Sequence, residues 1–277
     1  MNAPSLFGLV LAGGRSTRMQ RDKAAIAYHG QETQLEAAMK LLSPRVARAF
    51  VSVRADQTDD PVRSAWPRIV DRGEVEGPIA GISAALAEHP DVAWLVLACD
   101  LPFLDAATLD LLIAQRDPER DATAFRSSHD GLPEPLCAIF EPRARLGLAT
   151  HLAAGRNCPR KFLIQANTRL LDQPNPRALD NVNTVAEYGA AMSALDSTLE
   201  IRVQYYALLR EQAGRSLETL ATRARTPREL YAELAAKYPF TLPAEMLRVA
   251  VNAEFGDWSQ PLKAGDAVVF IPPVAGG

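Results

Sequence analysis

The stretch Leu6-Phe7-Gly8-Leu9-Val10-Leu11-Ala12-Gly13-Gly14 decides the fold of the first part of this chain. Its continuous apolar run is typical of a strand buried on both faces of a parallel sheet. The two glycines after the strand allow a tight bend and leave N–H groups free to bind phosphate oxygens. The loop is neither a Walker A motif nor a GxGxxG motif. It continues with basic residues that add positive charge: Arg15, Arg18, Arg21 and Lys23.

Strands and helices alternate after this loop. The apolar spacing predicts strands at 49–53 and 93–98, and helices at 34–42, 79–87 and 105–115. Such alternation is typical of a three-layer, Rossmann-like α/β domain with a mostly parallel sheet. Asp100 comes two residues after the second fully apolar strand, at the carboxyl ends of the strands, where open α/β folds place their ligands.

The pattern changes near residue 195. Residues 200–206 alternate between polar and apolar, as a half-buried strand does, and Thr226-Pro227-Arg228-Glu229 is a capping box that opens one helix. Short strands are predicted at 249–251 and 267–270. We therefore expect a first domain at residues 1–193, a linker at 194–199 and a small α+β domain at 200–277.

Composition limits the classes of partner. The chain has 277 residues, of which 48% are hydrophobic, and a formal net charge of −3. This charge gives no general attraction to nucleic acid or to anionic membranes, so we expect small molecules and proteins as partners. No basic region precedes the apolar run from Leu6 to Ala12, and this run is too short to cross a bilayer, so we expect a cytoplasmic protein. Cys99, Cys137 and Cys158 are widely spaced, which indicates core or reduced thiols rather than disulfides.

The run from Leu11 to Ala24 resembles the signature of the MobA family, the molybdenum cofactor guanylyltransferases, whose pattern is close to LAGGxSxRMGxDKA. It departs from that pattern at Gln20, where the family commonly has glycine. The matching positions are Leu11, Ala12, Gly13, Gly14, Ser16, Arg18, Met19, Asp22, Lys23 and Ala24. Later segments of the family follow in the expected order: Val70-Asp71, Gly77-Pro78-Ile79-Ala80-Gly81, Cys99-Asp100-Leu101-Pro102 and Asn181-Val182-Asn183-Thr184.

The resemblance implies transfer of GMP from GTP to molybdopterin, giving molybdopterin guanine dinucleotide and pyrophosphate. It implies catalytic roles for Lys23 and Asp100, with Asp100 as the Mg²⁺ ligand, and a carboxylate is the hard oxygen ligand that Mg²⁺ prefers. The implied nucleotide-binding residues are Leu11, Ala12, Gly13, Gly14, Arg18, Lys23, Asp71 and Asp100. Arg54 stands where the family has a nucleotide-binding asparagine, so that role is not transferred to it.

The last residues carry a second resemblance. Residues 263–277, with Pro272-Pro273-Val274-Ala275-Gly276-Gly277, resemble the end of MoaD, the small subunit of molybdopterin synthase, where DGDEVxFxPPVxGG is usual. Two glycines form a slim, flexible tail that can enter a narrow active site. The resemblance implies a ubiquitin-like β-grasp fold and a sulfur carrier. It also implies that a MoeB-like enzyme adenylates Gly277, which becomes a thiocarboxylate and delivers its sulfur in a complex with a MoaE-like large subunit.

Three alternatives stay open at this point. The first domain could use CTP or a sugar phosphate, which competition by CTP, UTP and GTP would test. The second domain could carry sulfur for another pathway. The whole chain could also be a non-catalytic scaffold, against which the presence of both Lys23 and Asp100 argues.

Overall fold

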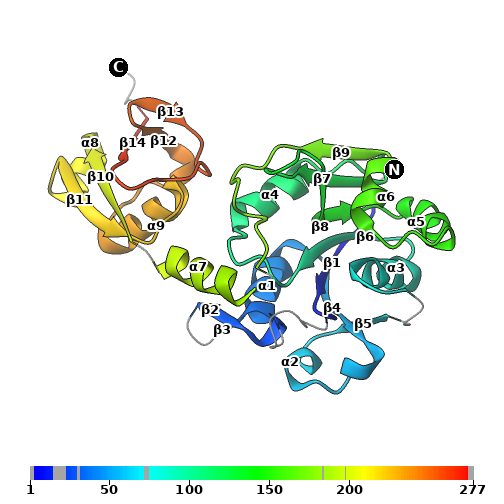
Figure 1. Cartoon of the computed structure of the whole chain (residues 1–277). Coiled ribbons are helices and arrows are strands. Elements are labelled where there is room, and N and C mark those ends of the chain that lie inside the picture. The colour runs from blue at the N-terminus through cyan, green and yellow to red at the C-terminus, as the bar shows by residue number, and fades with distance from the viewer. Residues whose placement is uncertain are drawn as a thin grey trace. The chain divides into compact units, whose positions relative to one another are not determined.

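The chain forms two compact units in the computed structural model, which describes residues 3–14, 23–29, 32–71, 75–182, 184–196 and 198–273. The units comprise residues Met1–Ala191 and Met192–Gly277. The division falls inside helix α7 (Val185–Asp196). The finer boundary predicted from the sequence, with a linker at 194–199, stays a prediction. Each unit is described below by itself (Figure 1).

A seven-stranded sheet forms the centre of the first unit. Its strands lie in the order β5 (Arg68–Asp71), β4 (Arg48–Arg54), β1 (Leu6–Leu11), β6 (Ala93–Ala98), β8 (Pro133–Phe140), β7 (Ala122–Arg126) and β9 (Thr168–Leu171). Strands β5, β4, β1 and β6 are parallel, β8 is antiparallel to both of its neighbours, and β7 and β9 are parallel to each other. The predicted mostly parallel sheet is confirmed.

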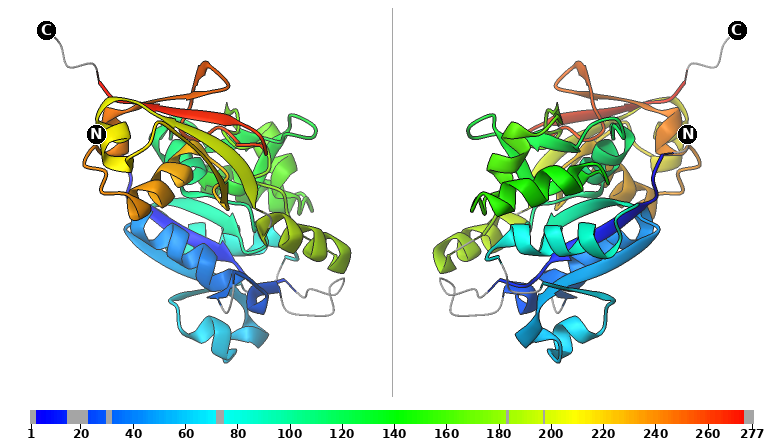
Figure 2. Two further views of the ribbon diagram at one scale, coloured as in Figure 1. Left: turned by 90° about the vertical axis from the view of Figure 1, so that its left-hand side faces the viewer. Right: turned by 90° about the vertical axis from the view of Figure 1, so that its right-hand side faces the viewer.

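Helices cover both faces of this sheet, so the predicted three-layer architecture is also confirmed (Figures 1 and 2). One core lies under α1 (Gln34–Leu42) and α4 (Ala106–Ala114), which contribute Leu35 and Leu109. The other face is covered by α3 (Pro78–Glu88), α5 (Ala144–Ala153) and α6 (Pro159–Gln165). Smaller elements are the helix α2 (Pro61–Ser64) and a hairpin of β2 (Ala27–His29) and β3 (Glu32–Thr33).

Strand β1 marks the point where the strand order reverses. The chain runs from β1 outward to β4 and β5, and then returns through α3 to β6 on the other side of β1. Two glycines make this return possible. Gly77 caps α3 with φ +89°, and a Cβ on Gly81 would lie 2.2 Å from the Ser52 hydroxyl on β4. Reversal points of this kind place ligands beyond the carboxyl ends of the strands.

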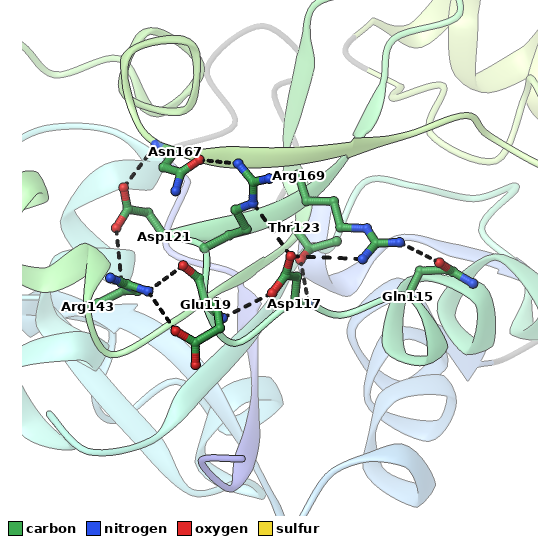
Figure 3. A network of polar contacts seen from close by, with 9 residues as sticks. Gln115, Asp117, Glu119, Asp121, Thr123, Arg143, Asn167 and Arg169 are labelled. Carbon is green, nitrogen blue, oxygen red and sulfur yellow. Dashed lines mark hydrogen bonds and ion pairs between the residues drawn. The ribbon is translucent and has the colours of Figure 1, made fainter. Parts of the chain in front are cut away.

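A network of mutually paired polar and charged side chains lies near the amino ends of the strands, opposite the carboxyl ends just described (Figure 3). Asp121 precedes β7 and accepts a hydrogen bond from the Asn167 backbone N–H at 2.9 Å, while Arg143 contacts both Asp121 and Glu119. Further along the network, Arg169 donates to Gln115 at 2.7 Å. Because these groups satisfy one another near the amino ends of the strands, we interpret the network as structural.

A mixed five-stranded sheet forms the second unit. Its strands lie in the order β11 (Leu217–Thr222), β10 (Leu199–Tyr205), β14 (Ala267–Ile271), β12 (Arg248–Val251) and β13 (Glu254–Gly256). Only β10 and β14 pair in parallel. The helix α9 (Pro227–Lys237) packs its Leu230 and Leu234 into the core with Phe270, and α8 (Ala207–Ala213) follows β10. This arrangement is the expected β-grasp fold.

A buried carboxylate ties β11 to α9 in this second unit. Glu218 is 9% exposed and accepts hydrogen bonds from the hydroxyls of Tyr205 at 2.6 Å and Tyr238 at 2.9 Å. Lys237 donates to its other oxygen at 2.9 Å. Burial raises the pKa of Glu218, but the hydrogen bonds from Tyr205, Lys237 and Tyr238 outweigh burial and hold that pKa below its ordinary value.

Two of the predicted core cysteines are buried, Cys99 at 7% and Cys137 at 1% exposure, and Cys158 is partly exposed. Burial raises the pKa of the Cys137 thiol, which makes it an unreactive core side chain.

Within the described parts of the chain, no helix is long and apolar enough to cross a membrane.

Candidate functional site

The carboxyl edge of the first sheet gathers the predicted loop residues. Leu11 ends β1 and lies in register with Ser52 of β4 on one side and Ala98 of β6 on the other. The chain then leaves the sheet. Ala12 still donates its N–H to the Ser52 carbonyl at 3.2 Å, whereas Gly13 and Gly14 lie beyond the last strand pairing. The glycine loop therefore starts at the reversal point of the strand order.

Asp100 lies next to this loop on the neighbouring strand. It follows β6 and Cys99, whose N–H approaches the Leu11 carbonyl at 3.4 Å, and it is partly buried. The Asp100 carbonyl accepts a hydrogen bond from Val182 at 3.1 Å. Val182, which belongs to the 181–184 segment singled out from the sequence, is thereby joined to Asp100. The structure brings these two distant motifs together at one edge of the sheet.

Asp71 reaches the same edge from farther away. It ends β5, where it lies in register with Arg54 of β4. Because β4 lies between β5 and β1, Asp71 is two strands from the glycine loop. A ligand that contacts both would have to extend across the end of β4, which a nucleoside triphosphate is long enough to do.

The remaining predicted site residues are Lys23, Arg18, Gly276 and Gly277. Lys23 is the first residue of a short 3-10 helix, Lys23–Ala25, in which Ala24 is buried. Arg18 lies outside the described residues, and so do both residues assigned to the sulfur carrier, Gly276 and Gly277. Their roles stay predictions.

Two arginines at this edge were not assigned a role from the sequence. Arg54 donates from Nη1 to the Gly13 carbonyl, and its Nε and Nη2 donate to the carboxylate of Asp56 at 2.8 and 3.0 Å. Arg63, in α2, is 1% exposed and donates from Nε and Nη2 to the Ala12 carbonyl at 2.9 and 2.8 Å. Asp60 pairs with Arg63 at 3.2 Å. Asp60-Pro61 signals the start of α2, but no local pattern reports a contact with a residue 51 positions earlier.

The one carboxylate considered at this edge is compatible with a metal ion that is bound together with the phosphates of a substrate. Among the described residues, no three His, Cys, Asp or Glu side chains cluster in a way that could hold an ion. Asp100 is nevertheless a partly buried carboxylate-bearing residue at the end of β6, the strand next to β1 and its glycine loop. Mg²⁺ is commonly bound by one or two carboxylates together with substrate phosphates and water, so a single protein carboxylate is compatible with it.

A glycine loop and an aspartate at the reversal point of an open α/β sheet are typical of nucleotide-binding proteins. The chain belongs to the family described as the MobA-like NTP transferase domain, which matches residues 8–170. Residues 203–277 match the ThiS family. The predicted combination of a MobA-like domain with a ThiS- or MoaD-like domain is confirmed.

Individual relatives agree with these families. A molybdenum cofactor guanylyltransferase of Burkholderia ambifaria is 31% identical over 199 residues, which cover 68% of this chain and 96% of that protein. A molybdenum cofactor biosynthesis bifunctional protein of Synechocystis is 37% identical over 184 residues, which cover 66% of this chain. The match spans 53% of the length of that Synechocystis protein.

A solved structure shares the fold of the first unit. The molybdopterin-guanine dinucleotide biosynthesis protein A of Archaeoglobus fulgidus superposes with a TM-score of 0.55 and covers 68% of this chain and 97% of its own. The two sequences are 22% identical, so this likeness concerns the fold alone.

Proposed function

We propose that the first unit transfers GMP from GTP to molybdopterin, giving molybdopterin guanine dinucleotide and pyrophosphate. The observation that carries this proposal is the meeting of Gly13, Asp100 and Val182 at the carboxyl ends of β1 and β6. Relatives named as molybdenum cofactor guanylyltransferases support the choice of GTP and molybdopterin over other nucleotides and acceptors.

The residues of this edge have separate roles in the proposed reaction. An oxygen of the molybdopterin phosphate attacks the α-phosphorus of GTP, the bond to the bridging β-phosphate oxygen breaks, and pyrophosphate leaves. The N–H groups of Gly13 and Gly14 bind phosphate oxygens, and Arg18 and Lys23 neutralise their charge. Leu11 and Ala12 shape the start of the loop, and Asp71 contacts the nucleotide.

Mg²⁺ is part of this proposal. Asp100 would hold it, and the ion would supply charge neutralisation at the phosphates while they are transferred. The chain's own contribution is to keep the Asp100 carboxylate at the end of β6, where the Val182 N–H fixes the backbone. The protein therefore acts mainly by positioning and by charge.

We further propose that the second unit carries sulfur as a thiocarboxylate on Gly277. Its match to the ThiS family extends through both terminal glycines. The segment that leads to them begins directly after β14, which lies between β10 and β12 in the sheet. A MoeB-like enzyme would adenylate the tail, and a MoaE-like subunit would receive its sulfur. Both activities then belong to one pathway, molybdenum cofactor biosynthesis.

One experiment tests the transferase. The full chain is incubated with Mg²⁺, molybdenum-loaded molybdopterin and GTP, CTP or UTP in separate reactions, and the dinucleotide and pyrophosphate are measured. We expect the guanine dinucleotide and pyrophosphate in equal amounts with GTP only. Equal or faster turnover with CTP would assign the unit to a cytidylyltransferase, and no product with any nucleotide would support the scaffold alternative.

A further inference from the structure

Two buried or half-buried arginines hold consecutive carbonyl groups of the glycine loop. Arg63 directs two donors at the Ala12 carbonyl, and Arg54 directs one at the Gly13 carbonyl. Both arginines come from the segment that runs from the end of β4 to the start of β5, far from the loop in sequence. Each is also paired with an aspartate of its own segment, Arg54 with Asp56 and Arg63 with Asp60.

The geometry of the peptide bond relates these contacts to the direction of the N–H groups of Gly13 and Gly14. In a planar trans peptide unit the C=O and the following N–H point in opposite directions. The peptide units after Ala12 and Gly13 are trans, so holding their carbonyls toward the arginines turns the N–H groups of Gly13 and Gly14 away from them. Among the residues that the structure describes, no acceptor is bonded to either N–H group. An added Cβ on Gly14 would also meet no described atom within 4 Å.

We propose that Arg54 and Arg63 are positioning residues that aim the N–H groups of Gly13 and Gly14 at the phosphates of the nucleotide. This inference rests on the proposed function. The aspartate partners matter to it, because Asp56 occupies the Nε and Nη2 of Arg54 and leaves Nη1 on the Gly13 carbonyl. Arg54 thus acts on the phosphates through the loop backbone and is not itself a phosphate ligand.

The main test replaces Arg54 with Met, which keeps the length of the side chain and removes its donors. We expect Arg54→Met to raise KM for GTP roughly tenfold with a smaller change in kcat, since a hydrogen bond to a charged donor is lost from the loop. Arg54→Lys, which keeps one charged donor, should recover part of the affinity. Because the Arg54 side chain is 24% exposed, the fold should survive both substitutions.

Arg45 provides a matched control at the opposite edge of the sheet. It also pairs with an aspartate, Asp110, at 2.7 Å, and donates to a backbone carbonyl, that of Leu41, at 2.8 Å. Arg45→Met should therefore remove the same kinds of bonds and leave KM for GTP unchanged. An equal rise in KM for both variants would overturn the proposal, because it would show a general effect on the fold.

Asp56→Ala separates positioning from direct phosphate binding. If Arg54 positions the loop, releasing it from Asp56 loosens the Gly13 carbonyl, and KM for GTP should rise about threefold to tenfold. If Arg54 bound phosphate itself, the same substitution would free a positive charge and KM would fall. A fall in KM, or no change, contradicts the proposal.

Arg63 is tested by Arg63→Lys, since the loss of a fully buried arginine can unfold the chain. Thermal melting accompanies each kinetic measurement.

Titration with GTP in the absence of molybdopterin tests the role of the arginines separately from the proposed guanylyl transfer. A wild-type chain that binds GTP without transferring GMP would contradict the proposed function, while the GTP dissociation constants of the variants would still test the arginines. Equal dissociation constants for wild type, Arg54→Met and Arg63→Lys would overturn the inference.

Discussion

In both units the proposed reacting group follows the end of a strand in the sequence, but the two proposed sites are built differently. In the first, the site lies beyond β1 and β6, and at least four separate segments meet there, including Asp100 and the two arginines Arg54 and Arg63. In the second, one strand, β14, leads directly into the tail that ends at Gly277. A convergent site depends on many long-range contacts, whereas a tail depends on its own last residues and on whichever partner receives it. Substitutions should therefore affect the two activities independently.

Deletion of Gly277 should have the largest effect. The proposed sulfur transfer needs this residue's carboxylate, so thiocarboxylate formation with a MoeB-like enzyme, ATP and a sulfur donor should be abolished. Guanylyl transfer should be unchanged, because none of the proposed phosphate ligands belongs to the tail. Intact-mass spectrometry detects the replacement of one oxygen by sulfur in the wild type. The assignment fails if the wild-type chain stays unmodified under conditions that convert a known carrier.

Asp100→Asn should reduce guanylyl transfer by about 100-fold or more, because a neutral amide is a poorer Mg²⁺ ligand than a carboxylate. Lys23→Ala should act in the same direction. Asp110→Asn is the control, since Asp110 is 61% exposed and pairs with Arg45 on the other edge. Thiocarboxylate formation should be normal in all three variants. Near-wild-type turnover of Asp100→Asn at saturating Mg²⁺ would refute the metal assignment.

Local sequence patterns predicted several of the strands and helices in both units. The apolar runs predicted β1 and β6, and the helical spacing predicted α1 with the bounds Gln34–Leu42. Thr226 caps α9 as expected, accepting the Glu229 N–H at 3.3 Å. These features could be predicted because each depends on residues that are close in sequence: burial on both faces, a 3.6-residue period, or a cap.

Long-range contacts could not be predicted in the same way. Nothing near Arg63 in the sequence indicates that its guanidinium binds the Ala12 carbonyl, because that pairing depends on how β4 and β1 align. The antiparallel direction of β8 could not be predicted either, because a run of apolar residues does not indicate in which direction its strand pairs. Glu218 looks like a polar residue on an alternating strand, and its tyrosine and lysine partners come from three other positions in the fold.

Gly14→Ala should weaken GTP binding roughly tenfold without lowering stability, a smaller effect than that of Asp100→Asn. An added methyl group would meet no described atom within 4 Å, but under the proposed function it would occupy space that the phosphates need. Gly189→Ala in α7 is the matched control, because it also has open space for a Cβ and lies within a helix. Equal GTP affinity of the two variants would show that the loop backbone does not contact the phosphates.

The smallest expected effect is confined to the second unit and depends on pH. The pKa of Glu218 lies below its ordinary value, so its ionised form stabilises the fold above the unfolded pKa of about 4.3, and this stabilisation is lost as pH falls through the lower folded value. Glu218→Gln should therefore weaken protection of β10 against hydrogen exchange at neutral pH, by about 1 kcal/mol.

The same variant should approach the wild type in acid, where the carboxyl of Glu218 is protonated and neutral like the amide that replaces it. Hydrogen exchange in the full chain, corrected for intrinsic rates, measures the protection of the β10 and β1 amides in one experiment. Protection of β1 should be the same in both proteins at every pH, because Glu218 and its partners all belong to the second unit. A difference in β10 that persisted unchanged below the folded pKa would mean that Glu218 acts by shape alone and not by its charge.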